Sequence, residues 1–314
     1  MNNKIIAVAV VLILAVGGVV FLNNTKSKTP IAQNGSIYCS SDGTFTDTKP
    51  IQSHRSYCVK SDSSGKTYSV NAPSEYSFSI IDDQGNTLKD FAITHTKQMH
   101  VIVVRKDLAY FQHVHPEFDP STGTFTLKDL TFPADGVYRV FADFAPVDGQ
   151  KDSMGMPLAV TVSEDVPAGT GANYVSQPIG TEENAKTFDG MTVSLITHGA
   201  MTSSAENMLM FNLNQNNKPV TDLQEYLGAL GHAVVLREGN LDFIHAHPIE
   251  DVKAKQNGTV SFMVDFPEAG KYKVFTQFQR GGKVITTDFV VSVAQGADQS
   301  GMQGMDMSMP GMHH

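Results

Sequence analysis

The chain has 314 residues, of which 41% are hydrophobic and 18% are charged. This composition excludes a wholly disordered chain, and the length suits two folded domains of roughly 150 residues each. The net charge of -9, without a basic patch, argues against nucleic-acid binding. Two cysteines and no tryptophan exclude a disulfide-dense scaffold and a four-cysteine zinc module.

The N-terminus begins with an uninterrupted uncharged run at residues 5–22, IIAVAVVLILAVGGVVFL. Its length is near the minimum for a membrane-spanning helix and long for the core of a signal peptide. Because no convincing cleavage site follows it, we predict an uncleaved membrane anchor over residues 1–22, with a cleaved signal as the alternative. Both interpretations export the rest of the chain to the cell surface or the periplasm.

Residues 23–66 are rich in Ser, Thr, Asn and Gly and predict a flexible tether. This segment contains both cysteines, Cys39 and Cys58. Outside the cytoplasm, two cysteines most simply form one disulfide. A metal cluster of Cys39, His54 and Cys58 is the alternative, although its spacing fits no standard metal motif.

The central part of the chain repeats itself. MHVIVVRKDLAYFQHVHP at 99–116 aligns without a gap to GHAVVLREGNLDFIHAHP at 231–248. A second pair of segments, 132–144 and 266–278, aligns with a further shift of two positions. Repetition of this kind indicates two copies of one structural unit. We therefore predict a first repeat at 67–165, a linker at 166–182, a second repeat at 183–295 and a tail at 296–314.

Each repeat contains short runs rich in Val, Ile, Phe, Tyr and Thr, separated by turn signals such as DPSTG at 119–123. Six or seven short strands in roughly 100 residues predict a β-sandwich of immunoglobulin or cupredoxin type. The predicted fold is therefore all-β, with two tandem sandwiches after an N-terminal transmembrane helix. Neither repeat contains a cysteine, which excludes a blue-copper centre because that site requires a thiolate.

Histidines recur at fixed positions on either side of one tight turn in each repeat, at 105–108 in the first and 237–240 in the second. If that turn is centred between Lys106 and Asp107, His100 pairs directly with His113. Opposed residues share one sheet face, as do residues two apart on a strand. The pattern therefore predicts three converging imidazoles in each repeat: His100, His113 and His115 in the first, and His232, His245 and His247 in the second. Apolar residues on the same predicted face place the site at the mouth of the sandwich core.

Three imidazoles suit Cu(II) or Zn(II) and leave one coordination position open. The histidines recur although neighbouring positions differ, such as Met99 against Gly231. This favours a metal site over the alternative, a structural hydrogen-bond cluster. His95 has no histidine partner in the second repeat and is an optional extra ligand. His198 also lacks a counterpart, and we predict that it is structural or on the surface.

The C-terminal tail combines methionine and histidine with Gly, Ser, Gln and Pro, a composition that cannot form a packed core. Thioethers are soft ligands that favour Cu(I). We therefore predict a disordered tail that captures Cu(I), with a low-complexity spacer as the alternative; its candidate ligands are Met302, Met305, Met307, Met309, Met312, His313 and His314. The loop at 147–157 carries Met154 and Met156 as a candidate second soft site.

The segment LGALGHAVVLREGNLDFIHAHP followed by FPEAGKYKVFTQFQ resembles a bacterial family of secreted or membrane-anchored proteins. Members of this family are described as extracytoplasmic heavy-metal-associated proteins, and MHVIVVRKDLAYFQHVHP resembles their sister repeat. The resemblance covers about 200 residues and implies the sandwich fold and export. The methionine-rich tail is similar to the tails of copper-resistance and copper-chaperone proteins.

Together these patterns predict a membrane-tethered, extracytoplasmic copper-binding protein that sequesters copper or delivers it to a metal-transport protein. No Ser/His/Asp arrangement or phosphate-binding loop indicates an enzyme. The main alternative is a cell-surface adhesion or scaffold protein with structural histidines and no metal. A further alternative is a zinc hydrolase or lyase, for which Glu117 or Glu250 is the nearest candidate base.

Overall fold

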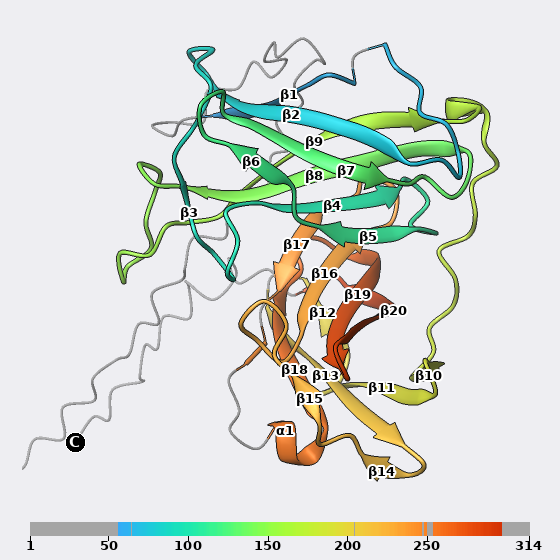
Figure 1. Cartoon of the computed structure of the whole chain (residues 1–314). Helices are drawn as coiled ribbons and strands as arrows, with labels where there is room; N and C mark the ends of the chain where they lie inside the picture. The colour runs from blue at the N-terminus through green and yellow to red at the C-terminus, as the bar shows by residue number, and fades with distance from the viewer. Residues whose placement is uncertain (1–55, 64, 204, 247, 250–253, 297–314) are drawn as a thin grey trace, which may run out of the picture. The chain divides into compact units, whose positions relative to one another are not determined.

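The computed structural model describes residues 56–63, 65–203, 205–246, 248–249 and 254–296. Within these ranges the regular secondary structure is β-strand (Figure 1), apart from a single turn of α-helix and a single 3-10 turn. The strands form four sheets, two in each repeat. The all-β prediction and the prediction of two tandem sandwiches are therefore confirmed.

The first repeat is a sandwich of two antiparallel sheets. One sheet has the strand order β1-β2-β7-β6, and the other has the order β3-β8-β4-β5 with β9 also paired to β8. Their bounds are β1 Tyr57–Ser61, β2 Ser74–Asp82, β3 Phe91–Ala92, β4 His100–Arg105, β5 Phe111–Val114, β6 Glu117–Asp119, β7 Thr124–Leu130, β8 Gly136–Pro146 and β9 Val160–Ala168, followed by the 3-10 turn η1 Gly171–Asn173.

The core of this sandwich follows from the alternation along its strands. In β2, Tyr76, Phe78 and Ile80 are buried and their neighbours are less so, as the period of two in a strand requires. They join Val101 and Val103 of β4 in one apolar cluster between the two sheets. The odd-numbered residues of β4 therefore face the interior of their own sandwich.

Strand β1 lies in the segment that the sequence predicts to be a tether. It pairs with β2 from Tyr57 opposite Asp82 to Ser61 opposite Phe78. The short apolar run Tyr57, Cys58 and Val59 is buried, which is why this stretch joins the sandwich despite its polar surroundings. Cys58 is thus held in a sheet, whereas Cys39 lies outside the described residues, and the disulfide between them stays a prediction.

The second repeat is built in the same way. One sheet has the order β10-β11-β13-β14 with β18 also paired to β13, and the other has the order β12-β20-β19-β16-β17 with β15 also paired to β19. Their bounds are β10 Ala185–Phe188, β11 Met191–Thr197, β12 Met201–Thr202, β13 Glu206–Gln215, β14 Lys218–Pro219, β15 Leu223–Gln224, β16 His232–Arg237, β17 Phe243–Ala246, α1 Ala254–Asn257, β18 Thr259–Asp265, β19 Gly270–Arg280 and β20 Lys283–Ala294.

The two repeats lie within one compact unit. An apolar cluster separate from the sandwich cores joins them. Ile102 and Val104 of β4 point away from their own core and pack with Val234 and Leu236 of β16. The ring of Phe111 stacks on the ring of Phe275 with centroids 4.4 Å apart and an angle of 13° between the planes. The sheets that contain β4 and β16 are therefore apolar on both faces. One face of each sheet lines its own sandwich core, and the opposite faces of the two sheets pack against each other.

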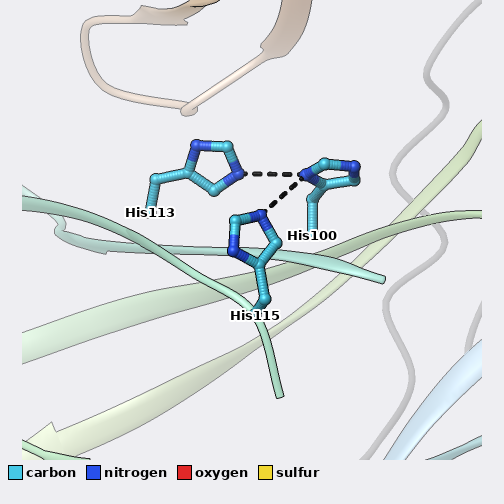
Figure 2. Close-up of side chains that lie close together, drawn as sticks. All are labelled: His100, His113 and His115. Carbon is cyan, nitrogen blue, oxygen red and sulfur yellow. Dashed lines mark hydrogen bonds between the residues drawn. The ribbon is translucent and has the colours of Figure 1, made fainter. Parts of the chain in front are cut away.

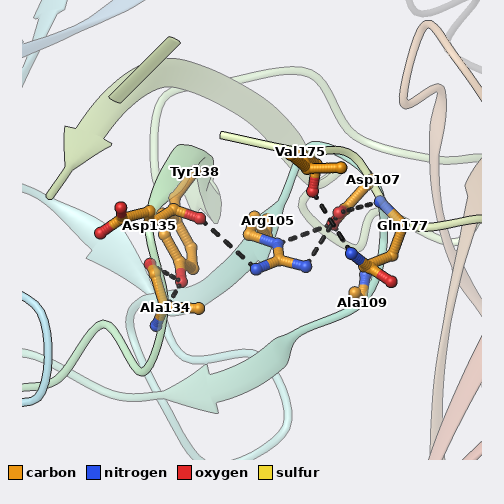
Figure 3. A network of polar contacts seen from close by, with 8 residues as sticks. All are labelled: Arg105, Asp107, Ala109, Ala134, Asp135, Tyr138, Val175 and Gln177. Atoms are coloured by element: carbon orange, nitrogen blue, oxygen red, sulfur yellow. Dashed lines mark hydrogen bonds and ion pairs between the residues drawn. The ribbon is translucent and has the colours of Figure 1, made fainter. Parts of the chain in front are cut away.

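A buried ion pair closes the opposite end of β4 from His100 (Figure 3). Arg105 donates two hydrogen bonds to Asp107, each 2.9 Å long. Asp107 also accepts the backbone N–H of Gln177, at 2.8 Å, which ties the segment after β9 to the first sandwich. Burial alone would raise the pKa of Asp107, but Arg105 and the backbone donors outweigh it and hold that pKa below its ordinary value.

Among the described residues, no helix is long and apolar enough to cross a membrane. The predicted anchor at residues 1–22 lies outside the described residues, so that prediction is not tested.

Candidate metal centre

The histidines of the first repeat sit on β4 and on the segment that begins with β5. Ile102 pairs with His113, and Val101 pairs with Val114. The prediction that His100 pairs with His113 is therefore wrong by two positions, because the turn is centred one residue later than predicted and Arg105 N–H reaches Tyr110 O. A shift of two preserves the face, so His100 and His113 still lie on the same side of the sheet.

Contrary to the prediction from the sequence, that shared face does not meet the interior of its own sandwich. His100 alternates with Val101 and so shares its side of β4 with Ile102 and Val104, which face the other repeat. Val234, Leu236 and Phe243 in the second repeat belong to the same shared cluster. The site therefore lies on the outer face of each sandwich, where the other repeat covers it, and not at the mouth of the core.

The structure brings the three histidines of the first repeat together, as the sequence predicts. Figure 2 shows the rings of His100, His113 and His115 turned toward one another. His100 Nδ1 is 3.1 Å from His113 Nε2 and 3.2 Å from His115 Nε2. Three nitrogens bound to one tetrahedral metal at about 2.0–2.1 Å lie roughly 3.3 Å apart, so this spacing is close to that of a three-histidine metal site.

Second contacts fix which nitrogen carries the proton in two of the three rings. His100 Nε2 is 3.0 Å from the carbonyl oxygen of Thr94, and because a carbonyl only accepts, this nitrogen is the N–H. His113 Nδ1 donates to Gln277 Oε1 at 2.8 Å. The Gln277 amide is oriented by its own N–H, which donates to Thr286 Oγ1 at 3.1 Å. His100 Nδ1 and His113 Nε2 are therefore the lone-pair nitrogens when the rings are neutral.

Neutral rings are the favoured state. Burial, followed by the neighbouring His115, lowers the pKa of His113 to about 2. Burial and the nearby His100 lower the pKa of His115 to about 3, and burial also lowers the pKa of His100. Two lone pairs therefore face each other across 3.1 Å, and such a contact is unfavourable unless a cation lies between them. The donor set fits a metal ion held by three neutral imidazoles.

The second repeat reproduces the same second contacts. His232 Nε2 is 2.8 Å from the carbonyl oxygen of Tyr226, the residue equivalent to Thr94. His245 Nδ1 donates to Asp143 Oδ2 at 2.7 Å. The pairing is again displaced from the predicted one, because Val234 pairs with His245. His247 lies outside the described residues, so the second three-histidine set is not tested.

Each repeat supplies the acceptor that orients a histidine of the other repeat. Asp143 in β8 and Gln277 in β19 are equivalent positions, and each pairs across its own sheet with the first histidine, His100 or His232. Asp143 accepts from His245 and Gln277 accepts from His113. Groups of this kind set the orientation and basicity of metal-bound histidines.

Sequence reasoning missed these two acceptors. The available signal was a polar residue at the same position of two otherwise apolar strands, in VFADF and VFTQF. The two acceptors also differ in charge. Burial alone would raise the pKa of Asp143, but its hydrogen bond with His245 outweighs burial and holds the pKa below its ordinary value. A carboxylate therefore supports His245, whereas a neutral amide supports His113.

A groove of about 500 Å³ lies beside the first site, with His113 and His115 among its lining residues. Lys128 lies in the same wall and forms a 2.6 Å ion pair with Glu117, the candidate base of the hydrolase alternative. Glu250, the other candidate, lies outside the described residues.

The remaining predicted residues divide into two groups. His198 is exposed, and Met154 and Met156 are exposed by 82% and 60% in a surface loop. The methionines and histidines of the tail lie outside the described residues, so their role as ligands stays a prediction.

The fold and the histidines define a tandem β-sandwich protein with a candidate metal centre. The chain belongs to the family described as Domain of unknown function (DUF8832), whose model matches residues 53–163 and 186–295. The two matches agree with the predicted repeat. The resemblance to heavy-metal-associated proteins stays a prediction, and no curated protein matches the chain.

Several solved structures are similar over most of the chain. Fibronectin(III)-like modules of Clostridium thermocellum CbhA are 11% identical, with 82% of this chain and 100% of that chain covered and a TM-score of 0.21. Domains 5-6 of the S-layer protein SbsC are 14% identical, with 77% and 98% covered and a TM-score of 0.22. Bovine butyrophilin is 11% identical, with 76% and 98% covered and a TM-score of 0.21. These TM-scores are too low to support an argument, and the sandwich fold rests on the strand pairing of this chain.

Proposed function

We propose that this protein binds copper outside the cytoplasm and sequesters it or passes it to a metal-transport protein. The observation that carries the proposal is the contact between His100 Nδ1 and His113 Nε2, two lone-pair nitrogens 3.1 Å apart in a buried site. A proton is a poor occupant of that contact because burial lowers the pKa of both rings. A metal ion is the occupant that the three imidazoles fit.

The choice of metal follows from ligand chemistry. Neutral imidazoles suit Cu(II) and Zn(II), whereas thioethers select Cu(I). A chain that offers both kinds of ligand suits copper in both oxidation states. In this proposal the tail, with Met302 to Met312 and the two terminal histidines, collects Cu(I), and the imidazole sites hold Cu(II) or Zn(II). The role is binding and transfer, without an enzymatic reaction.

Two features support transfer as well as storage. Three protein ligands leave one coordination position open, as at metal sites that exchange ligands. The groove beside His113 and His115 gives that position a route to solvent, and a ligand from a partner protein could enter by it. The apolar run at residues 5–22 supports a membrane tether, which would keep the protein beside a metal transporter.

The test is a metal titration of the full chain purified in detergent. Copper(I), copper(II) and zinc(II) are titrated into the wild type, into His113→Ala/His115→Ala, and into a chain truncated after Gly296. The control is His198→Ala, which removes an exposed histidine away from the site. We expect the double variant to lose one Cu(II) or Zn(II) equivalent and the truncated chain to lose Cu(I) binding, with the control unchanged. A wild type that binds none of the three ions would remove the metal proposal and leave the adhesion or scaffold alternative.

A further inference from the structure

We propose that His95 of the first repeat completes a second metal site with His232 and His245 of the second repeat, so that one metal ion bridges the two repeats. This inference rests on the proposed metal-binding function and adds a ligand that the repeat pattern does not predict. The equivalent position in the second repeat is Leu227, so the first site receives no such ligand.

The three rings lie close together at the junction of the repeats. The centroid of His95 is 5.5 Å from that of His232 and 5.9 Å from that of His245. The centroids of His232 and His245 are 6.2 Å apart. Three imidazoles on one metal, each bound at about 2.0–2.1 Å, have centroids roughly 5.2–5.6 Å apart. The set is thus wider than a closed site by less than 1 Å, so metal binding would draw the three rings closer together.

The hydrogen bonds of His232 and His245 leave one lone-pair nitrogen on each neutral ring. His232 is 1% exposed, and its Nε2–H is used by the carbonyl of Tyr226. Its other nitrogen, Nδ1, is buried and has no hydrogen-bond partner among the described residues. His245 donates its Nδ1–H to Asp143, so its Nε2 is the lone-pair nitrogen of the neutral ring. The lone pair of His232 Nδ1 accepts no hydrogen bond from the described residues, and a metal ion bound there would satisfy this buried polar atom.

The loop that carries His95 has the same backbone conformation as its counterpart in the second repeat. His95 and Thr96 have φ angles of +50° and +69°, in the left-handed region that residues other than glycine rarely adopt. The equivalent pair in the second repeat is Leu227 and Gly228, at +54° and +80°. The loop therefore has the same backbone conformation in both repeats. The second repeat has Gly228 at the position where the first repeat has Thr96.

His95 serves the second site better than the first. The centroid of His95 is 6.1 Å from that of His100, further than from either histidine of the second repeat. His100 also turns its lone-pair nitrogen toward His113 and His115, so no lone pair of His100 is left for a metal shared with His95. The ligand set of the second site therefore spans both repeats, whereas that of the first site is confined to one.

This difference assigns the two sites different properties. The second site gains an imidazole from the other repeat and has a carboxylate, Asp143, behind His245. A carboxylate raises the basicity of a metal-bound histidine more than an amide does. The second site therefore holds its metal more tightly and stabilises the contact between the repeats, while the first site exchanges its metal through the groove.

The test uses the full chain with the first site disabled by His113→Ala/His115→Ala. Co(II) and Cu(II) are the probes, because the absorption of Co(II) reports its coordination number and the magnetic resonance of Cu(II) counts its imidazole ligands. His95→Leu, which copies the residue at 227, and His95→Asn, which tolerates the left-handed φ, are added to that background. His198→Leu is the matched control. The melting temperature of each metal-free variant confirms that it folds.

We expect the disabled-site parent to bind one metal ion with His95 as a ligand. Both His95 variants should then lose one imidazole from the Cu(II) spectrum, bind 10- to 100-fold more weakly and lose most of the metal-induced rise in melting temperature. The control should match the parent. If His95→Leu and His95→Asn bind as the parent does, or the parent binds no metal while the wild type binds one, the bridging site is wrong although the proposed function survives. If the wild type binds no metal, the proposed function itself fails.

Discussion

Replacing Gln277 by leucine should weaken metal binding at His113, although the two residues are 164 positions apart in the chain. Gln277 accepts the His113 Nδ1–H at 2.8 Å and thereby keeps His113 Nε2 free for the metal. Leucine has a similar volume but no acceptor. The variant therefore leaves a buried N–H without a partner and no longer holds the ring in the tautomer that binds.

The size of the effect follows from two independent estimates. A buried donor left unsatisfied costs about 1–3 kcal/mol. Removing the partner that orients a metal-bound histidine typically costs about 10- to 100-fold in affinity, which is about 1.4–2.8 kcal/mol. The two ranges agree, so we expect the dissociation constant of the first site to rise by about one to two orders of magnitude.

The assay is a competition titration of Cu(II) and Zn(II) against a chelator of known affinity. Gln279→Leu, two residues along β19, is the control for the substitution itself. Gln277→Glu supplies a carboxylate like Asp143 and should bind at least as tightly as the wild type, because a charged acceptor makes the ring more basic. If Gln277→Leu binds metal as tightly as Gln279→Leu, the assignment of the His113 tautomer is refuted.

Three further predictions concern stability. Asp107→Ala should cost about 3–5 kcal/mol in the free energy of unfolding, measured with denaturant, because it leaves the buried guanidinium of Arg105 unpaired; a cost below 1 kcal/mol would contradict the network in Figure 3. Phe275→Ala should cost about 3–5 kcal/mol and should let the two repeats unfold in separate calorimetric transitions, whereas a single unshifted transition would contradict the shared cluster. The metal-free protein should lose stability as the pH falls from 7 to 4. The pKa values of His113 and His115 drop to about 2 and about 3 on folding, so below the ordinary value of 6.5 the unfolded chain binds protons that the folded chain does not. A melting temperature that is constant over this range would contradict the buried, neutral histidines.

Much of the fold was predictable because each sequence pattern that indicates a strand or a site occurs twice, once in each repeat. Runs such as HVIVV and HAVVL identify β4 and β16, and the histidines at equal offsets identify one shared face. The predicted turn centre was one residue too early, since the Arg105 N–H bonds to the carbonyl oxygen of Tyr110 and so sets the register of the hairpin. The face survived that error because a shift of one in the turn moves the pairing by two.

The surroundings of the site were not predictable in the same way. Val234 and Leu236 share a face with the histidines. The sequence pattern of an apolar strand face is the same whether that face packs in the core of its own sandwich or against another sandwich. Contacts between the repeats leave no periodic pattern, so the roles of Asp143 and His95 emerge only once the two β-sheets are placed against each other. Cys58 was assigned to a tether for a related reason, since an edge strand of five residues is too short to show alternation.

Each repeat supplies the hydrogen-bond acceptor for a histidine of the other repeat, Asp143 for His245 and Gln277 for His113. This arrangement affects how such a protein can diversify. Two separate chains, each with one repeat, would pair through the same face as a two-fold symmetric dimer, and symmetry would force identical acceptors onto both sites. Joining the two copies in one polypeptide removes that constraint, because each half can then be altered alone. Aspartate at 143 and glutamine at 277 are such an alteration. In the proposed function, a covalent duplication would let two copies of one ligand pattern acquire different metal affinities, which no homodimer of that repeat could do.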